Sequence, residues 1–184
     1  MGLTVKHTAI EGIFLLRSAG ISEDQRGYFW KLFEESAFAD ENLCTHFPES
    51  YVTHSKVGVF RGLHFQLPPD DHAKIVTCLK GAVLDYVLDL RKNSKTFGKA
   101  CAFELNDKDR DSVYIPTGCA HGFYVPGPSE ATLLYNVGSE YSPQRDAGLH
   151  WTSLKDSIEI EWSPEILSHR DGGFQPFHAF DTPF

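Results

Sequence analysis

The amino-acid sequence predicts an all-β protein, an antiparallel sandwich or barrel with a few short helices. Its composition favours this class, because 14 Phe, 7 Tyr, 15 Gly and 10 Pro in 184 residues suit short strands separated by turns. The segment GAVLDYVLDLR (81–91) alternates between two sets of side chains, which is the period of a strand with two different faces. No GxGxxG or GxxxxGK[ST] motif is present, so neither a dinucleotide fold nor a P-loop is indicated.

Each predicted strand is a short run of apolar and β-favouring residues bounded by Gly, Pro, Asn or Asp. In chain order the strands cover 12–17, 27–33, 51–66, 73–79, 81–91, 99–105, 111–115, 121–125 and 131–137. The segment EESAFADEN (34–42) is the best helix, and SPEILS (163–168) predicts the start of a short second helix. Because no long helices separate the strands, a doubly wound parallel sheet is not expected.

Length and charge limit the class of protein. At 41% hydrophobic and 23% charged residues, the chain suits one domain over residues 1–184. Its formal net charge of −8 opposes a general electrostatic grip on DNA or RNA. No apolar run is long enough for a bilayer or a secretory signal, and the four cysteines form no CxxC pair. We therefore expect reduced thiols, no nucleic-acid or membrane partner, and a cytoplasmic location.

The segment GVFRGLHFQ (58–66) carries the first polar candidates. On a strand, His64 and Gln66 share one face while Arg61 points the other way, although strand twist could bring Arg61 to the rim of the same cavity. A small β-barrel can hold one ligand among inward polar groups. Taken singly, His64 is as often a packed ring as a functional one.

Four further candidates also have ordinary structural interpretations when each is taken alone. Lys74 could lie at a strand end with its ammonium group in water, and Tyr135 could be a core aromatic residue. His121 follows a turn, and Asp171 stands at a turn that it could cap.

Taken in order, the motifs resemble one known family. GVFRGLHFQ, AKIV, DLRKNSKTFGK, YIPTGCAHGF, LLY, YSP, IEIEW and ILSHRD together resemble the dTDP-4-dehydrorhamnose 3,5-epimerases over about residues 5–171. The resemblance implies a cupin-like jelly-roll subunit, a homodimer and a cofactor-independent isomerase. It implies a nucleotide-diphospho-4-keto-6-deoxy sugar as substrate. The enzyme would invert both C3 and C5 by removing the proton next to the C4 ketone and returning a proton on the opposite face.

The same resemblance implies the catalytic roles. His64 would be the base, and Tyr135 the proton donor on the opposite face of the sugar. Lys74 would stabilise the enolate oxygen. Asp171 would orient His64 by hydrogen bonding to its ring, with Asp85 as a competing orienter on the strand pattern.

Substrate-binding residues are implied as well. Arg61 and Arg26 match positions that grip a diphosphate, and His121 matches a pocket histidine. The N-terminal strand region commonly crosses to a neighbouring subunit, so Arg26 and Phe29 would complete the partner's pocket. The C-terminal segment, about 163–184, is expected to pack near the active site. Gln66 shares the face of His64.

Several positions depart from the family pattern where the nucleobase and the outer part of the sugar are expected to bind: Thr53, Lys31, Glu140 and Asn136. These departures leave the nucleotide open, since dTDP, CDP or GDP sugars remain candidates, and they leave the exact sugar and its downstream product open. A C3-only epimerase is one alternative. Another is a metal-dependent cupin, although Gln66 stands where an HxH pair is expected and no spacing unites His54, His72 and His121. A non-catalytic sugar-nucleotide binder is a third.

Overall fold

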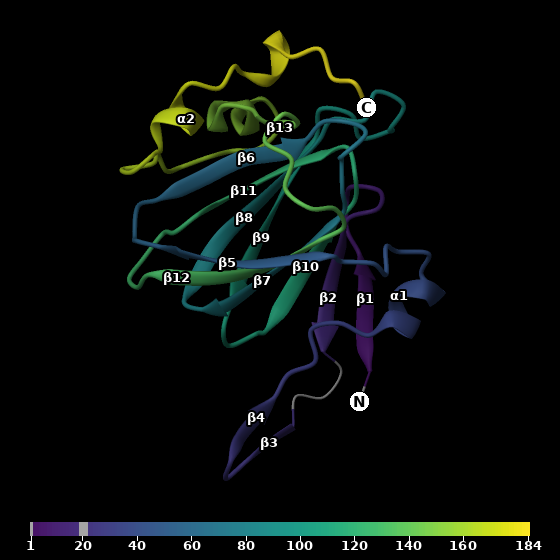
Figure 1. Cartoon of the computed structure of the whole chain (residues 1–184). Coiled ribbons are helices and arrows are strands. Elements are labelled where there is room, and N and C mark those ends of the chain that lie inside the picture. The colour runs from purple at the N-terminus through teal and green to yellow at the C-terminus, as the bar shows by residue number, and fades with distance from the viewer. Residues whose placement is uncertain (1, 19–21) are drawn as a thin grey trace.

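Two antiparallel sheets packed face to face form the body of the protein (Figure 1). The structure is a computed structural model that describes residues 2–18 and 22–184. The first sheet has the strand order β1-β2-β10-β7-β12-β5, and the second has β13-β6-β11-β8-β9. The predicted all-β jelly roll with a few short helices is confirmed.

The strands of the first sheet are β1 (Leu3–His7), β2 (Phe14–Ser18), β10 (Asp111–Ile115), β7 (Lys74–Lys80), β12 (Ala131–Val137) and β5 (Glu49–Ser55). Those of the second are β13 (Asp146–Gly148), β6 (Phe60–Gln66), β11 (Cys119–Tyr124), β8 (Ala82–Asp89) and β9 (Ala100–Asn106). A separate hairpin pairs β3 (Ser22–Asp24) with β4 (Gly27–Phe29). The helices are α1 (Glu35–Asp40), α2 (His169–Gly172) and the 3₁₀ turns Trp151–Asp156 and Phe177–Ala179.

The alternation seen in the sequence of β8 determines which side chains enter which core. Val83 and Val87 lie in the cluster between the two sheets, whereas Tyr86 and Leu88 lie in the cluster on the outer face of the second sheet. The C-terminal segment covers that outer face and passes over β6 (Figure 1). Both faces of the second sheet are therefore buried, which holds β6, β8 and β11 in place as one wall of the interior.

Two predicted elements need correction. The run 51–66 is not one strand, because the chain turns at Gly58 (φ +78°) and passes from β5 in one sheet to β6 in the other. Residues 163–168 are not helical, because Ile166 bonds to the chain beside β6 as an isolated bridge to Val59. The short helix α2 begins only at His169.

Boundaries differ elsewhere. The strand predicted over 27–33 ends at Phe29, and three short strands, β1, β3 and β13, were not predicted. The predicted helix 34–42 is present as the shorter α1, whose Phe38 is fully buried. None of the helices in residues 2–18 and 22–184 has the length and apolar character that a membrane span requires.

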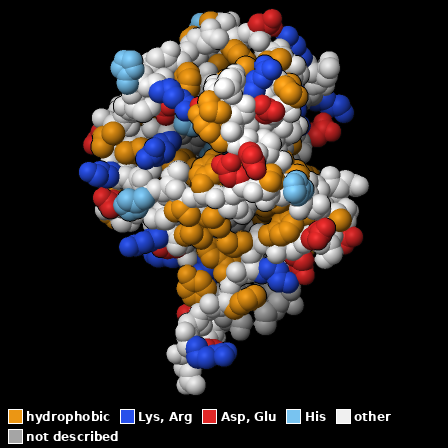
Figure 2. Space-filling view, in the orientation of Figure 1, with side chains coloured by type: hydrophobic (Ala, Val, Ile, Leu, Met, Phe, Trp, Pro, Cys, Tyr) orange, Lys and Arg blue, Asp and Glu red, His pale blue; other side chains and the backbone are white. Residues whose placement is uncertain are grey.

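The β3–β4 hairpin projects from the body, away from both sheets (Figure 1). On the face seen in Figure 2, basic and acidic side chains are interspersed, and apolar side chains gather where the hairpin joins the body. The hairpin and the segment after it expose large aromatic side chains, Tyr28, Phe29 and Phe33.

Candidate active site

A cleft between the two sheets collects most of the predicted polar residues. Its inner chamber, about 140 Å³, is lined by Tyr51, Thr53, Arg61, His64, Lys74, His121, Phe123 and Tyr135. Its outer chamber, about 310 Å³, is lined by Glu49, Tyr51, His64, Phe65, Gln66, His72, Lys74, Val137, Ser139, Tyr141, Asp146 and Arg170. Tyr51, His64 and Lys74 belong to both, so they stand where the two chambers meet.

His64 lies on β6 in the second sheet and is held by Asp171 of α2. Its Nε2 donates to Asp171 Oδ1 at 2.9 Å, which leaves Nδ1 without a hydrogen-bond partner among the described residues. Asp171 is buried, and its other oxygen accepts from the Gly62 backbone N–H at 3.2 Å. Burial raises the pKa of Asp171, but the bonds from His64 and Gly62 outweigh it, and the net pKa is lowered. The carboxylate is therefore charged at neutral pH, and it holds the imidazole ring by one nitrogen.

Asp85, the competing orienter, contacts a different histidine. Its Oδ2 accepts from His121 Nε2 at 2.7 Å, and both side chains are buried. Burial raises the pKa of Asp85 even though His121 opposes the shift. The described residues around the cleft thus include two separate carboxylate–histidine pairs, with Asp171 on His64 and Asp85 on His121.

Arg61 reaches the inner chamber through a β-bulge. Along β6 and β11, His64 pairs with His121 and Arg61 pairs with Phe123, so β6 has one more residue than β11 between these pairs. Gly62 takes φ +128° there, and a Cβ on it would come 2.5 Å from Gly122 Cα. The extra residue turns Arg61 to the same side as His64. The sequence pattern placed Arg61 on the opposite face, with strand twist as a way to the rim of the cavity; the register shift is a feature that the pattern of one strand does not reveal.

Lys74 lies on β7 in the first sheet, and its Nζ is 3.5 Å from the backbone oxygen of His64. The side chain is 6% exposed, and burial lowers its pKa from 10.5 to about 8. Lys74 therefore still carries a positive charge at neutral pH, at the junction of the two chambers.

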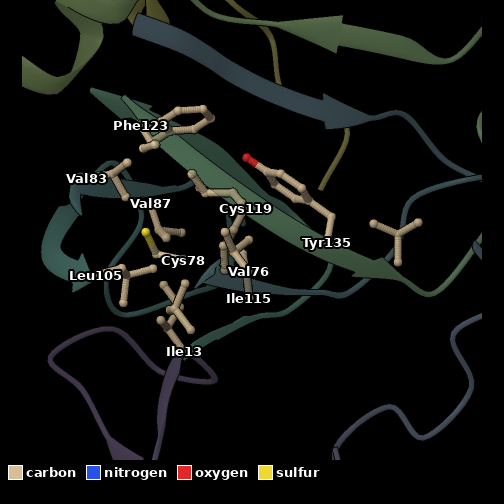
Figure 3. Close-up of a cluster of buried hydrophobic side chains, with 14 of the residues drawn as sticks. Ile13, Val76, Cys78, Val83, Val87, Leu105, Ile115, Cys119, Phe123 and Tyr135 are labelled. Atoms are coloured by element: carbon tan, nitrogen blue, oxygen red, sulfur yellow. The ribbon is translucent and has the colours of Figure 1, made fainter. Parts of the chain in front are cut away.

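Tyr135 lies on β12 in the first sheet, opposite the wall that carries His64. Figure 3 shows its ring beside the interior apolar cluster, with the hydroxyl pointing to the side on which Phe123 lies. Burial raises the pKa of its phenol well above 10, and the Thr53 hydroxyl lies next to it. The phenol is therefore neutral, and it is a proton donor rather than a base.

Gln66 lines the outer chamber, but its side-chain amide is hydrogen-bonded to two loops of the protein. Its Nε2 donates to Asp70 O at 2.8 Å, and its Oε1 accepts from the Ser142 backbone N–H at 2.7 Å. His72 also belongs to this wall, since Ser139 Oγ lies 2.8 Å from its Nδ1. Burial lowers the pKa of His72 to about 4, so this histidine is uncharged.

Four predicted binding residues do not line this chain's cleft. Arg26 and Phe29 lie on the projecting hairpin, where Arg26 pairs with Asp24 at 2.6 Å. Lys31 forms an ion pair with Glu34 at 2.9 Å. Glu140 contributes its backbone oxygen to Gln66, and its side chain is not part of the lining.

Sequence reasoning missed several residues that line the cleft, and Tyr51 and Arg170 are two of them. Tyr51 could have been found, because it shares a strand face with Thr53 at a spacing of two. Arg170 stands next to Asp171 and pairs with Asp146 at 2.7 Å, a contact that the sequence does not signal.

The three histidines considered for a metal site do not come together in the structure. His54 contacts Thr132 and Glu130, while His72 and His121 have the separate partners described above. Within residues 2–18 and 22–184, no group of three His, Cys, Asp or Glu could hold a metal ion.

Known proteins resemble this chain along nearly its whole length. A family model described as dTDP-4-dehydrorhamnose 3,5-epimerase matches residues 7–179. The dTDP-4-dehydrorhamnose 3,5-epimerase of Escherichia coli strain K12 is 36% identical over 176 residues, covering 92% of this chain and 91% of that protein.

Two solved structures are informative about the site. The dTDP-6-deoxy-D-glucose-3,5-epimerase of Legionella pneumophila, in complex with dTDP-4-keto-L-rhamnose, superimposes with a TM-score of 0.88 at 27% identity, covering 98% of this chain and 95% of that chain. ChmJ, a 3'-monoepimerase from Streptomyces bikiniensis in complex with dTDP-quinovose, gives a TM-score of 0.84 at 28% identity, covering 93% of this chain and 86% of that chain.

Proposed function

This chain belongs to the dTDP-4-dehydrorhamnose 3,5-epimerase family, and we propose that it inverts C3, and C5 as well, of a nucleotide-diphospho-4-keto-6-deoxy sugar without a cofactor. One observation carries the proposal. His64 and Tyr135 line the same chamber from opposing sheets, and Lys74 lines it with them. A base and an acid on opposite faces of a sugar ring are what inversion of a carbon centre requires.

The reaction moves protons only. His64 accepts the proton from the carbon next to the C4 ketone, and the electron pair of that C–H bond moves onto the ketone oxygen as an enolate. Lys74, still charged at neutral pH, stabilises this oxygen. Tyr135 then donates its phenolic proton to the opposite face of the carbon, and the ketone re-forms. Proton exchange with water afterwards removes the added proton from His64 and returns one to the Tyr135 phenolate, which completes the cycle.

Asp171 has an orienting role in this scheme. Its charged carboxylate fixes the imidazole of His64 by one ring nitrogen and stabilises the imidazolium that forms when the substrate proton arrives. The free nitrogen of His64 is then the one that meets the substrate.

The binding residues are proposed from their positions. Arg61 points into the inner chamber from the bulge, where a guanidinium group suits the diphosphate, and Thr53 and His121 contact the sugar. Gln66 supports the outer wall through its bonds to the 70 and 139–142 loops. Thymidine diphosphate is the proposed carrier, because the ligands named in the solved complexes are dTDP sugars.

Incubation of candidate dTDP-, CDP- and GDP-4-keto-6-deoxy sugars in deuterated water tests the function. We expect deuterium at both C3 and C5 of the epimerised dTDP sugar, read by mass spectrometry and NMR. Label at C3 alone would make this protein a C3-only enzyme, as the likeness to a 3'-monoepimerase allows. No label in any of the three sugars would refute the proposed activity.

We also propose that the β3–β4 hairpin completes the cleft of a second copy of this chain in a homodimer. A two-stranded hairpin is marginal by itself, and this one exposes Tyr28 and Phe29 by 53% and 56%. The Arg26 side chain is 85% exposed, so it is accessible to a diphosphate in the partner's cleft. Lys31 and Glu140 would then lie near the nucleotide end of the shared site.

Subunit complementation tests this sharing. Arg26→Ala and His64→Ala proteins should each be weakly active. A mixed dimer would contain one intact site, because the Arg26→Ala subunit supplies an intact cleft and the His64→Ala subunit supplies an intact hairpin. Random exchange of subunits predicts recovery of about a quarter of the wild-type rate in a symmetric dimer. No recovery on mixing, or light scattering that shows a fully active monomer, would contradict the shared site.

A further inference from the structure

Tyr51 stacks directly on the proposed proton donor. On β5 and β12 the two residues are paired in register, Tyr135 with Tyr51, and both side chains line the inner chamber. Their ring centroids are 4.8 Å apart and the ring planes differ by only 12°. Among the described residues, the other ring in contact with Tyr135 is His121, whose edge meets it at a centroid distance of 5.9 Å and an angle of 69°. The phenol of Tyr135 is thus held between the face of one ring and the edge of another.

Tyr51 is not a core residue that happens to touch Tyr135. It is 41% exposed, and it forms part of the wall shared by the inner and outer chambers. Partial burial of the residue, with the nearby carboxylates of Glu49 and Asp146, raises the pKa of Tyr51 to about 12, so its phenol stays neutral. A partly exposed aromatic residue at the junction of two chambers adds little to the apolar core, but it can restrict how its neighbour's ring is aimed.

We propose that Tyr51 is a positioning residue that holds the Tyr135 phenol toward the sugar ring and so controls how many enolates are protonated on the inverted face. The inference rests on the proposed epimerase function. His64 lies on the opposite sheet and is oriented by Asp171, so proton removal does not depend on the Tyr51–Tyr135 stack. Loss of the stack should therefore reduce inversion while hydrogen exchange through His64 continues.

The test separates exchange from inversion in deuterated water. For each variant, the amount of deuterium in recovered, uninverted substrate is compared with the amount in the epimer. Tyr135→Phe is the reference, since removal of the donor should slow inversion more than exchange. Tyr51→Leu removes the stacked ring, Tyr51→Met is a second ringless variant in case the first folds poorly, and Tyr51→Phe keeps the ring but removes the hydroxyl. Val52→Ala, at an exposed neighbouring position on the same strand, is the matched control.

We expect the ratio of inversion to exchange to fall about 2- to 10-fold in Tyr51→Leu and Tyr51→Met, the range that one aromatic pair can contribute. The Michaelis constant should change little, and Tyr51→Phe and Val52→Ala should keep the wild-type ratio. In the Tyr135→Phe background, Tyr51→Leu should add no further loss, because the donor that it positions is already absent.

Three outcomes would count against the inference. An unchanged ratio in both ringless variants would show that the stack does not position the donor. An equal fall in Tyr51→Phe would assign the effect to the Tyr51 hydroxyl and would overturn the stacking role. If the wild-type protein neither exchanged nor inverted any candidate sugar, the proposed function itself would fail, which is a result distinguishable from the other two.

Discussion

Replacement of His64 by Ala is expected to lower both deuterium exchange and epimer formation by about 10²–10⁴-fold, the usual contribution of a positioned general base. Both readouts should fall together, because proton abstraction precedes either result. The fold should persist, since the imidazole side chain is 34% exposed and anchored by a single carboxylate. Initial rates by NMR, with thermal unfolding followed by circular dichroism, measure the two effects.

His54→Ala is the matched control for that variant. His54 is exposed and contacts Thr132 and Glu130, and it does not line either chamber. Its removal should leave the rate within about twofold of wild type, as surface substitutions usually have small effects. Near-full turnover by His64→Ala would show that another group is the base.

Replacement of Lys74 by Met is expected to lower the maximal rate by about 10²–10³-fold, since removal of one donor to a developing oxyanion typically has this effect. Methionine has a similar length and suits the buried position, so the loss reports the charge rather than a cavity. Lys80→Met, at the exposed end of the same strand, is the control and should keep the wild-type rate. A Lys74→Met enzyme with an unchanged rate would remove Lys74 from the mechanism.

The pH dependence gives a second test of Lys74. With a pKa of about 8, the group is charged below that pH and neutral above it, so the maximal rate should fall as pH rises through about 8. This limb should be absent from the residual activity of Lys74→Met. Stability changes in the opposite direction: between pH 8 and 10.5 the unfolded chain binds the Lys74 proton more strongly than the native protein, so this group's contribution makes the free energy of unfolding rise with pH. A loss of rate in this interval is therefore not explained by unfolding driven by Lys74.

Some features followed from local pattern. The alternation predicted in 81–91 puts every second residue on the same face, and in the structure Val83 and Val87 lie on one face and Tyr86 and Leu88 on the other. Period-2 alternation is a property of the strand itself, so it survives whatever the strand pairs with. The same rule extended from Thr53 leads to Tyr51.

Other features depended on partners far away in the chain. From the sequence alone, either Asp85 or Asp171 could orient His64. The position of α2 in the fold brings Asp171, 107 residues further along the chain, to the His64 ring. Arg61 faces the cleft because β6 has a bulge opposite β11, and a bulge is defined by the register between two strands rather than by either strand's residues.

By itself, the sequence determined the all-β class and which side chains of a strand share a face. Through its resemblance to a known family, it also indicated candidate site residues that include His64, Lys74 and Tyr135. The tertiary structure decided that His64 and Tyr135 stand on opposing sheets around one chamber, which carboxylate serves which histidine, and that Tyr51 covers the face of Tyr135. The physical reason is that side-chain alternation is set by local backbone geometry, whereas distances across the cleft depend on how two separately formed sheets pack and on the register of their strands.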